Sequence, residues 1–137
     1  MKEKPHIHVA AGLIRKDGKL LISKRPEDGH LPGYWEFPGG KQEQGESLQQ
    51  CLEREIEEEL GIKIRAGETY MTIVHEYESK WVSLHVIEGS LLAFEPKALE
   101  CQEFRWVDTC DLNAYQFPPP DIKVIESLSR ASDNERP

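Results

Sequence analysis

The sequence predicts an α/β domain in which strands precede and follow a central helix, and a second helix ends the chain. Three observations lead to this fold class. Residues 6–15 alternate apolar and polar side chains, residues 47–60 have the composition of a helix, and residues 62–94 are rich in β-forming residues. We therefore expect an α/β/α sandwich around a central mixed sheet. With 137 residues, we expect one domain over residues 1–130 and a disordered tail over residues 131–137.

The first part of the chain is predicted to form a hairpin, a loop and a short extended segment. The alternating strand at residues 6–15 is followed by Asp17-Gly18, a strong turn signal, and by a return strand at residues 19–24. Residues 25–34 are rich in Pro, Gly and Asp, which predicts a loop over one end of the sheet. Residues 35–38 then lead as an extended segment into a glycine pair.

The central helix is predicted from Ser47 to Leu60. Its sequence is rich in Leu, Gln and Glu, which are good helix formers, and it contains neither proline nor glycine. Ser47 is a suitable N-cap, and Gly61 is a natural stop signal. The helix also carries an apolar strip, formed by Leu52, Ile56 and Leu60, that is expected to face the core.

Three glutamates lie beside that apolar strip. At about 100° per residue, Glu55, Glu58 and Glu59 fall within an arc of about 100°. Carboxylates at these spacings repel one another, so a bound cation would stabilise the helix. Oxygen ligands without nearby His or Cys suit Mg²⁺ or Mn²⁺. The alternative is an ordinary solvated helix face, which acidic runs commonly form.

The second half is predicted to return to the sheet. Residues 62–77 and 81–94 are expected to be strands joined by a turn at residues 78–80, with a bend at Gly89-Ser90. Residues 104–108 predict a further short strand, and the FPPP segment at 117–120 is extended and rigid. Asp121 is then expected to cap a second helix, with Ile122, Ile125 and Leu128 on one side.

Composition excludes several functional classes. The net charge of −8 argues against binding to duplex nucleic acid. The sequence contains neither an apolar run of transmembrane length nor an N-terminal signal peptide, so a cytoplasmic protein is expected. The three cysteines show no metal-binding spacing and are expected to be free thiols. The five histidines likewise show no ligand spacing, and we assign them no role.

The segment around the acidic helix resembles the Nudix box. Gly40, Glu46, Arg54-Glu55-Ile56, Glu58-Glu59 and Gly61-Ile62 match every fixed position of that motif. Nudix hydrolases cleave nucleoside diphosphates linked to another moiety, using divalent metals and an in-line attack by water. The resemblance implies that Glu55, Glu58 and Glu59 are metal ligands and that either Glu55 or Glu58 activates the water. Arg54, four residues before Glu58, would hold that carboxylate in place.

Other residues around the box are assigned with alternatives. Glu46 is a catalytic candidate, although its position at the helix start would also explain it. The Gly39 and Gly40 backbone, which lacks Cβ atoms, could approach metal or phosphate closely, and Lys41 could neutralise a phosphate oxygen. The resemblance also implies one more metal-binding glutamate before the last strand. We favour Glu100, which lies six residues before Trp106, and Glu103 is the competing residue.

The similarity extends to the MutT-like branch, whose form appears in WEFPGGK at residues 35–41. Members of that branch that hydrolyse 8-oxo-dGTP read the base with an asparagine after the FPP segment. Here Asp121 follows instead, as in the branch called CTP pyrophosphohydrolases, and an ionised aspartate can accept a hydrogen bond from a cytosine amino group. The resemblance suggests that Arg25, Glu36, Phe37 and Tyr77 line the same pocket.

We therefore expect a Mg²⁺-dependent nucleoside triphosphate pyrophosphohydrolase that sanitises oxidised nucleotides such as 8-oxo-dGTP. The alternative substrate is a cytidine or modified-pyrimidine nucleotide. A non-catalytic base-reading module is the rival of another class, but such domains have usually lost the carboxylates that this chain keeps. Hydrolysis of ADP-ribose or a dinucleoside polyphosphate is disfavoured because the expected downstream signatures are missing. The sequence leaves open whether the protein is a monomer or a homodimer.

Overall fold

The computed structural model describes residues 4–25, 33–93, 95–101 and 103–135. Within them, the strands are β1 (His6–Lys16), β2 (Lys19–Lys24), β3 (Trp35–Glu36), β4 (Gly39–Lys41), β5 (Lys63–Glu76), β6 (Trp81–Ala93) and β7 (Glu103–Asp108). The helices are α1 (Leu48–Leu60), the 3₁₀ helix η1 (Thr109–Ala114) and α2 (Pro119–Glu135). The sheet has the order β3-β2-β1-β6-β5, with β4 paired to β1 and β7 paired to β2. Only β1 and β6 run parallel among these pairs, so the sheet is mixed.

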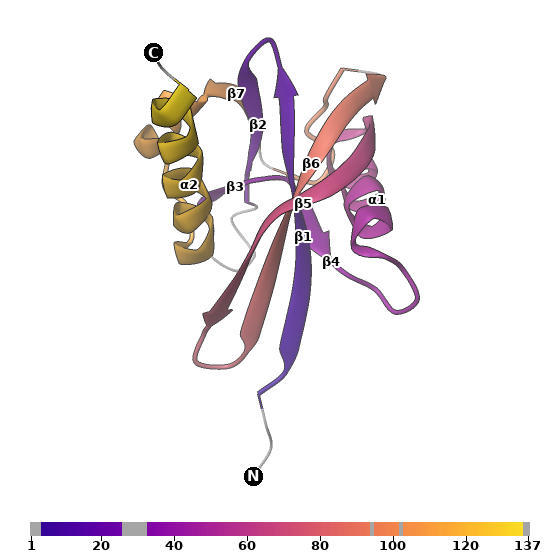
Figure 1. Cartoon of the computed structure of the whole chain (residues 1–137). Helices are drawn as coiled ribbons and strands as arrows, with labels where there is room; N and C mark the ends of the chain where they lie inside the picture. Colours follow the sequence, from indigo (N-terminus) through magenta and orange to yellow (C-terminus); the bar gives the residue numbers. More distant parts are fainter. Residues whose placement is uncertain (1–3, 26–32, 94, 102, 136–137) are drawn as a thin grey trace.

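Figure 1 shows α1 and α2 on opposite sides of this sheet. The alternation of β1 supplies both cores, because successive side chains of a strand point to opposite faces. Ala11 and Leu13 belong to the cluster that contains the apolar residues of α2, whereas Ala10 and Ile14 belong to the cluster of α1. The α/β/α sandwich expected from the sequence is confirmed.

The central helix agrees with the sequence prediction at both ends. Ser47 is the N-cap, and its side chain accepts a hydrogen bond from the backbone N–H of Gln50 while Gln50 bonds back to the cap. Gly61 ends the helix with a left-handed backbone at φ 66°, which glycine adopts without steric cost. The predicted apolar strip of Leu52, Ile56 and Leu60 is fully buried.

Two details of the strands differ from expectation. The predicted bend at Gly89-Ser90 is wrong, because β6 continues through both residues, which pair with Ala66 and Arg65. Two register shifts lie instead in the partner strand β5, between Ala66 and Met71, and a third lies between the pairs of Lys63 and Ile64. The glycine pair, expected to follow the extended segment, is itself a strand that pairs antiparallel with β1.

The second helix begins earlier than predicted. It starts at Pro119, so Asp121 lies inside the first turn and the predicted N-cap role is wrong. Proline fits there because the first helical N–H groups have no partner within the helix. Ile122, predicted to share the buried side, is 45% exposed, whereas Ile125 and Leu128 are buried as expected.

Two predicted segments extend beyond the residues that the structure describes. The predicted loop at residues 25–34 lies mostly outside the described residues. The α2 backbone continues to Glu135, into the segment expected to form a tail, and residues 136–137 are not described. The division into one domain and a tail stays a prediction. Among the described residues, no helix combines the length and hydrophobicity needed to cross a membrane.

Candidate active site

A cavity of about 430 Å³ lies between the sheet, α1 and the start of α2. Most residues predicted for the site line it. These are Arg25, Glu36, Phe37, Gly39, Gly40, Lys41, Glu55, Glu59, Tyr77, Glu100 and Asp121. Three other predicted residues, Glu46, Arg54 and Glu58, do not contribute to the lining. The structure therefore separates residues that face the cavity from residues that act behind it.

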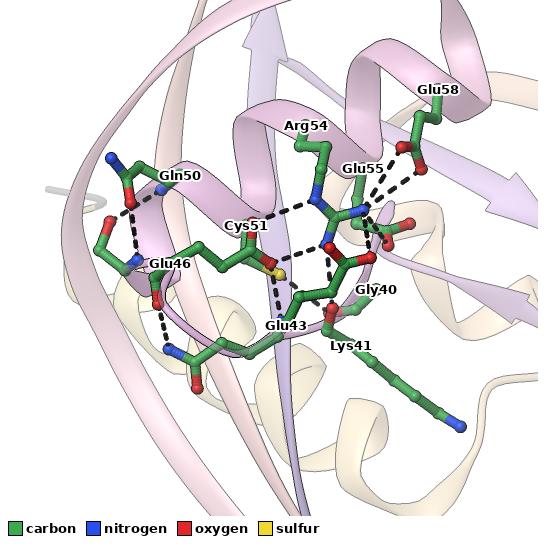
Figure 2. A network of polar contacts seen from close by, with 11 residues as sticks. Gly40, Lys41, Glu43, Glu46, Gln50, Cys51, Arg54, Glu55 and Glu58 are labelled. Carbon is green, nitrogen blue, oxygen red and sulfur yellow. Dashed lines mark hydrogen bonds and ion pairs between the residues drawn. The ribbon is translucent and has the colours of Figure 1, made fainter.

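Arg54 is the centre of the polar network behind the cavity (Figure 2). Its Nε and Nη2 atoms donate to the two carboxylate oxygens of Glu46 at 3.1 and 2.7 Å. Its Nη1 donates to Glu55 at 2.9 Å and to Glu58 at 3.3 Å, and Nη2 also donates to the Lys41 carbonyl at 3.2 Å. The predicted contact from Arg54 to Glu58 is present, but the two-pronged bond to Glu46 is the closer one.

Glu46 therefore holds Arg54 rather than facing the cavity. The hydrogen bond from Arg54 and one from the backbone N–H of Glu43 lower the Glu46 pKa to about 2. Glu46 precedes the N-cap Ser47, so the helix start alone does not account for its position. Sequence reasoning missed this pairing because Glu46 and Arg54 are eight residues apart and meet only through the loop before α1.

The carboxylates at the cavity end of α1 are partly or largely removed from water. Burial raises the pKa of Glu55, against the hydrogen bond from Arg54. Burial, with the charges of Glu36 and Glu55, raises the pKa of Glu59 to about 9. The Oε2 atom of Glu59 is buried without a hydrogen-bond partner. An unpartnered buried carboxylate oxygen is costly unless a proton or a cation satisfies it.

Divalent metal fits this donor set. Glu55, Glu59 and Glu100 line one cavity and offer only oxygen, the donor that Mg²⁺ and Mn²⁺ prefer. Among the described residues, no group of three or more His, Cys, Asp or Glu side chains is already gathered around a single metal position. Glu58, also predicted as a ligand, is 47% exposed at its side chain and bonded to Arg54.

The structure gives a different reason for the glycine pair. A Cβ on Gly39 would lie 2.8 Å from the carbonyl carbon of Ala10, and a Cβ on Gly40 would lie 2.8 Å from Cγ of Glu55. Both distances are well below ordinary carbon contacts of about 3.5–4.0 Å. Gly39 thus lets β4 approach β1, and Gly40 leaves room for the Glu55 carboxylate. The predicted approach of this backbone to metal or phosphate stays a prediction.

The structure separates the two candidates for the downstream glutamate. Glu100 lines the cavity, and its backbone N–H donates to the Glu59 carbonyl at 3.2 Å, which places it beside the end of α1. Glu103 instead pairs with Arg105 at 3.2 Å in β7. The geometry therefore favours Glu100, although its role as a ligand stays a prediction.

A second group of predicted residues lies at the α2 end of the cavity. Arg25 pairs with Glu36 at 2.5 Å, and burial raises the pKa of Glu36 against this pairing. Asp121 is buried, with 6% of its surface exposed. Burial and the charge of Glu36 raise its pKa to about 7, against a hydrogen bond from the Phe37 backbone. Burial and the negative charge of Asp121 also raise the pKa of Tyr77.

Some lining residues were missing from the sequence prediction. Lys80 lines the cavity from the turn between β5 and β6, with its Nζ 5.8 Å from the centre of the Tyr77 ring. The floor is apolar and includes Val9 and Leu84 from the adjacent strands β1 and β6. The alternation of β1 could have indicated Val9, whereas a lysine in a turn gives no local signal of a site. The predicted residue Lys41 also lines the cavity, and its side chain extends away from Arg54 in Figure 2.

Comparison with known proteins identifies the family. The sequence profile described as a NUDIX domain matches residues 9–127. The chain belongs to the Nudix family of hydrolases. Nudix relatives include a Haemophilus influenzae protein named 8-oxo-dGTP diphosphatase, 38% identical over 133 residues, which cover 96% of this chain and 98% of the relative. An Escherichia coli protein named CTP pyrophosphohydrolase is 36% identical over 127 residues, covering 89% of this chain and 90% of that protein.

The Nudix fold is matched by solved structures as well. A MutT protein from Methanosarcina mazei aligns with a TM-score of 0.86 and 30% identity, covering 99% of this chain and 100% of that one. Nudix hydrolases generally use divalent metals, which agrees with the oxygen donors at the α1 end of the cavity. The chemistry that such a metal supplies is neutralisation of the negative charge on a pyrophosphate group.

Three histidines of this Nudix domain gather outside the cavity. His6 and His8 on β1 stack with ring centres 4.7 Å apart, and His8 Nδ1 lies 3.0 Å from His85 Nε2 on β6. Ser83 and Thr72 hydroxyls bond to His6 and His85 at 2.6 and 3.3 Å. Burial, followed by the charges of His8 and His6, lowers the pKa of His85. No ligand spacing is visible in the sequence here because the cluster spans two strands.

Proposed function

We propose that this Nudix hydrolase is a Mg²⁺-dependent nucleoside triphosphate pyrophosphohydrolase that releases a nucleoside monophosphate and pyrophosphate. The preferred substrate in this proposal is an oxidised purine nucleotide such as 8-oxo-dGTP. The observation that carries it is a cavity with partly buried carboxylates of α1 at one end and the buried Asp121 at the other. That arrangement suits a triphosphate held by metal and a base held by the start of α2.

The metal ligands in this proposal are Glu55, Glu59 and Glu100, with Glu58 and the Gly39 backbone completing the set. Sequence reasoning left the water-activating base open between Glu55 and Glu58. We assign it to Glu55, because Glu55 lines the cavity, where a water molecule could reach it, whereas Glu58 does not line the cavity.

The polar residues behind and beside the acidic end have supporting roles in the proposal. Arg54, held by Glu46, keeps Glu55 and Glu58 in position through its guanidinium group. Lys41 neutralises a phosphate oxygen as the substrate enters. A Glu55→Gln variant should lose far more of kcat than Glu58→Gln if Glu55 is the base. Equal losses, or the larger loss in Glu58→Gln, would contradict the assignment.

The base-binding end is proposed to consist of Arg25, Glu36, Phe37, Tyr77 and Asp121. With a pKa of about 7, the Asp121 carboxyl is present in both protonation states near neutral pH. The protonated form can donate to a purine carbonyl, and the ionised form can accept from a cytosine amino group. This observation favours a cytidine nucleotide as the second candidate substrate.

Steady-state kinetics on 8-oxo-dGTP, dGTP, dCTP and a 5-substituted dCTP at fixed Mg²⁺ test the substrate assignment. We expect the highest kcat/KM for 8-oxo-dGTP and a clear margin over dGTP. If 8-oxo-dGTP is no better than dGTP while a cytidine nucleotide is preferred, the cytidine alternative replaces the main proposal. If no nucleotide is hydrolysed but one binds, the chain is a non-catalytic base-reading module.

The proposal places the protein in the cytoplasm as a monomer or homodimer that binds neither membranes nor duplex nucleic acid. The nucleotide pool that it would act on is dissolved there, and the net charge of −8 disfavours a polyanionic duplex. Size-exclusion chromatography with light scattering would distinguish monomer from dimer. Retention of the protein on duplex DNA at physiological salt would contradict the proposed lack of binding to duplex nucleic acid.

A further inference from the structure

The segment Phe37–Gly39 connects the two ends of the cavity. At one end, the Phe37 backbone hydrogen-bonds to the Asp121 carboxyl group. At the other end, two residues later, the Gly39 backbone hydrogen-bonds to the Glu59 carboxyl group. Both carboxyl groups line the cavity. The segment thus contacts one buried carboxyl group at each end of the site.

This segment is also fixed from its sides. The Pro38 carbonyl accepts a hydrogen bond of 2.8 Å from the Gly12 N–H of β1. The buried Phe37 ring stacks on Phe117, with ring centres 5.4 Å apart and planes 28° from parallel. Because Gly39 lies closely against Ala10, the backbone there has little freedom to absorb a displacement of its neighbours. We therefore expect a shift at Phe37 to displace Gly39 and Gly40 as well.

Gly40 lies next to Glu55, and Gly39 next to Glu59, which are two of the proposed metal ligands. We propose that Asp121 is a positioning residue for the metal end of the site, acting through the Phe37–Gly39 segment, in addition to its proposed contact with the base. This inference rests on the proposed function for the base contact and for the metal ligands. The positioning effect itself concerns metal affinity and needs no nucleotide.

Mn²⁺ binding to the nucleotide-free protein, followed by electron paramagnetic resonance, tests this inference. Asp121→Ala removes the acceptor for the Phe37 backbone, whereas Asp121→Asn keeps an oxygen of the same shape. We expect Asp121→Ala to weaken Mn²⁺ binding about tenfold, the low end of what groups behind metal ligands contribute. Asp121→Asn should stay within about twofold of wild type. Because both variants remove the carboxylate charge, the difference between them isolates position from charge.

Two further variants make the result specific. Phe117→Leu loosens the Phe37 ring without changing any carboxylate, and it should also weaken Mn²⁺ binding. Ile122→Ala, an exposed neighbour in the same helical turn, is the matched control and should bind Mn²⁺ as wild type does. Thermal unfolding and the amide NMR signals of Gly39 and Gly40 verify that each variant is folded and report whether the segment has moved.

The inference is overturned if Asp121→Ala binds Mn²⁺ as wild type does, or if Asp121→Ala and Asp121→Asn weaken binding equally. An unchanged affinity in Phe117→Leu would likewise exclude transmission through Phe37. If the wild type hydrolyses no nucleotide, while Asp121→Ala weakens Mn²⁺ binding and Asp121→Asn does not, the positioning role stands and the proposed function fails. If only the KM for nucleotides rises in Asp121→Ala, Asp121 contacts the base and has no positioning role.

Discussion

Replacing Gly40 with alanine should reduce catalysis while leaving the fold intact. The new Cβ would lie 2.8 Å from Cγ of Glu55 and would meet the Glu55 carboxylate as well. Ordinary carbon contacts are about 3.5–4.0 Å, so the side chain of Glu55 must move by about 1 Å. Because Gly40 does not have a positive φ, the substitution introduces this contact without backbone strain.

The expected loss in kcat/KM is about 100-fold, since a displacement of about 1 Å of a group that acts on the reacting atoms commonly costs that much. Stability should fall by only about 1 kcal/mol, because the end of a flexible glutamate side chain can turn away. The assay is hydrolysis of the preferred nucleotide at saturating Mg²⁺, combined with thermal unfolding of the same preparation.

Gly39→Ala is the matched control for this prediction. Its Cβ would meet the backbone of Ala10 and Ala11, which cannot turn away, so this variant should lose stability by about 3 kcal/mol or fail to fold. Full activity in Gly40→Ala, or unfolding of this variant as readily as Gly39→Ala, would contradict the prediction. Either result would mean that Glu55 does not occupy the space beside Gly40.

Three further predictions follow from the ionisable groups. Arg54→Lys keeps the charge but loses the two-pronged bond to Glu46, so kcat should fall about 10-fold or more with circular dichroism unchanged. The raised pKa of Glu59, about 9 without metal, means that its stabilising contribution is present at low pH and lost as pH rises through about 9. In the proposed site Mg²⁺ displaces that proton, so the rise in unfolding temperature caused by Mg²⁺ should grow between about pH 5 and 9, and Glu59→Gln should abolish this growth. The lowered pKa of His85 has the opposite sign, so its contribution is present above the unfolded pKa of about 6.5 and lost as pH falls. Urea unfolding at pH 7 and pH 5 should show a smaller acid-induced loss of stability in His8→Gln than in wild type. An equal loss would contradict the lowering of the His85 pKa by His8.

Local signals predicted the parts of the fold that depend on neighbouring residues. The helix from Ser47 to Leu60 was predicted because its cap, its apolar strip and its stop signal all lie within the segment. The error at Asp121 has a local cause too, since the segment at residues 117–120 was predicted to be extended, although a helix tolerates proline in its first turn. Because Asp121 was interpreted as an N-cap, its burial was not predicted.

Contacts between distant segments were beyond the sequence. The motif indicated Arg54 as a partner of Glu58, but the closer pairing with Glu46 depends on the path of the loop before α1. The cluster of His8 and His85 depends on the parallel pairing of β1 with β6. Lys80 reaches the cavity only because the β5–β6 turn lies beside it. Each of these contacts depends on the three-dimensional path of the chain, which no local sequence signal gives.

We propose a metal-assisted pyrophosphohydrolase site in the cavity between α1 and the start of α2. The decisive measurement is phosphorus NMR of the products formed from 8-oxo-dGTP in the presence of Mg²⁺. We expect the wild type to form a nucleoside monophosphate and pyrophosphate, and Glu55→Gln to form much less of both. Release of a nucleoside diphosphate with orthophosphate, or full activity in Glu55→Gln, would contradict it.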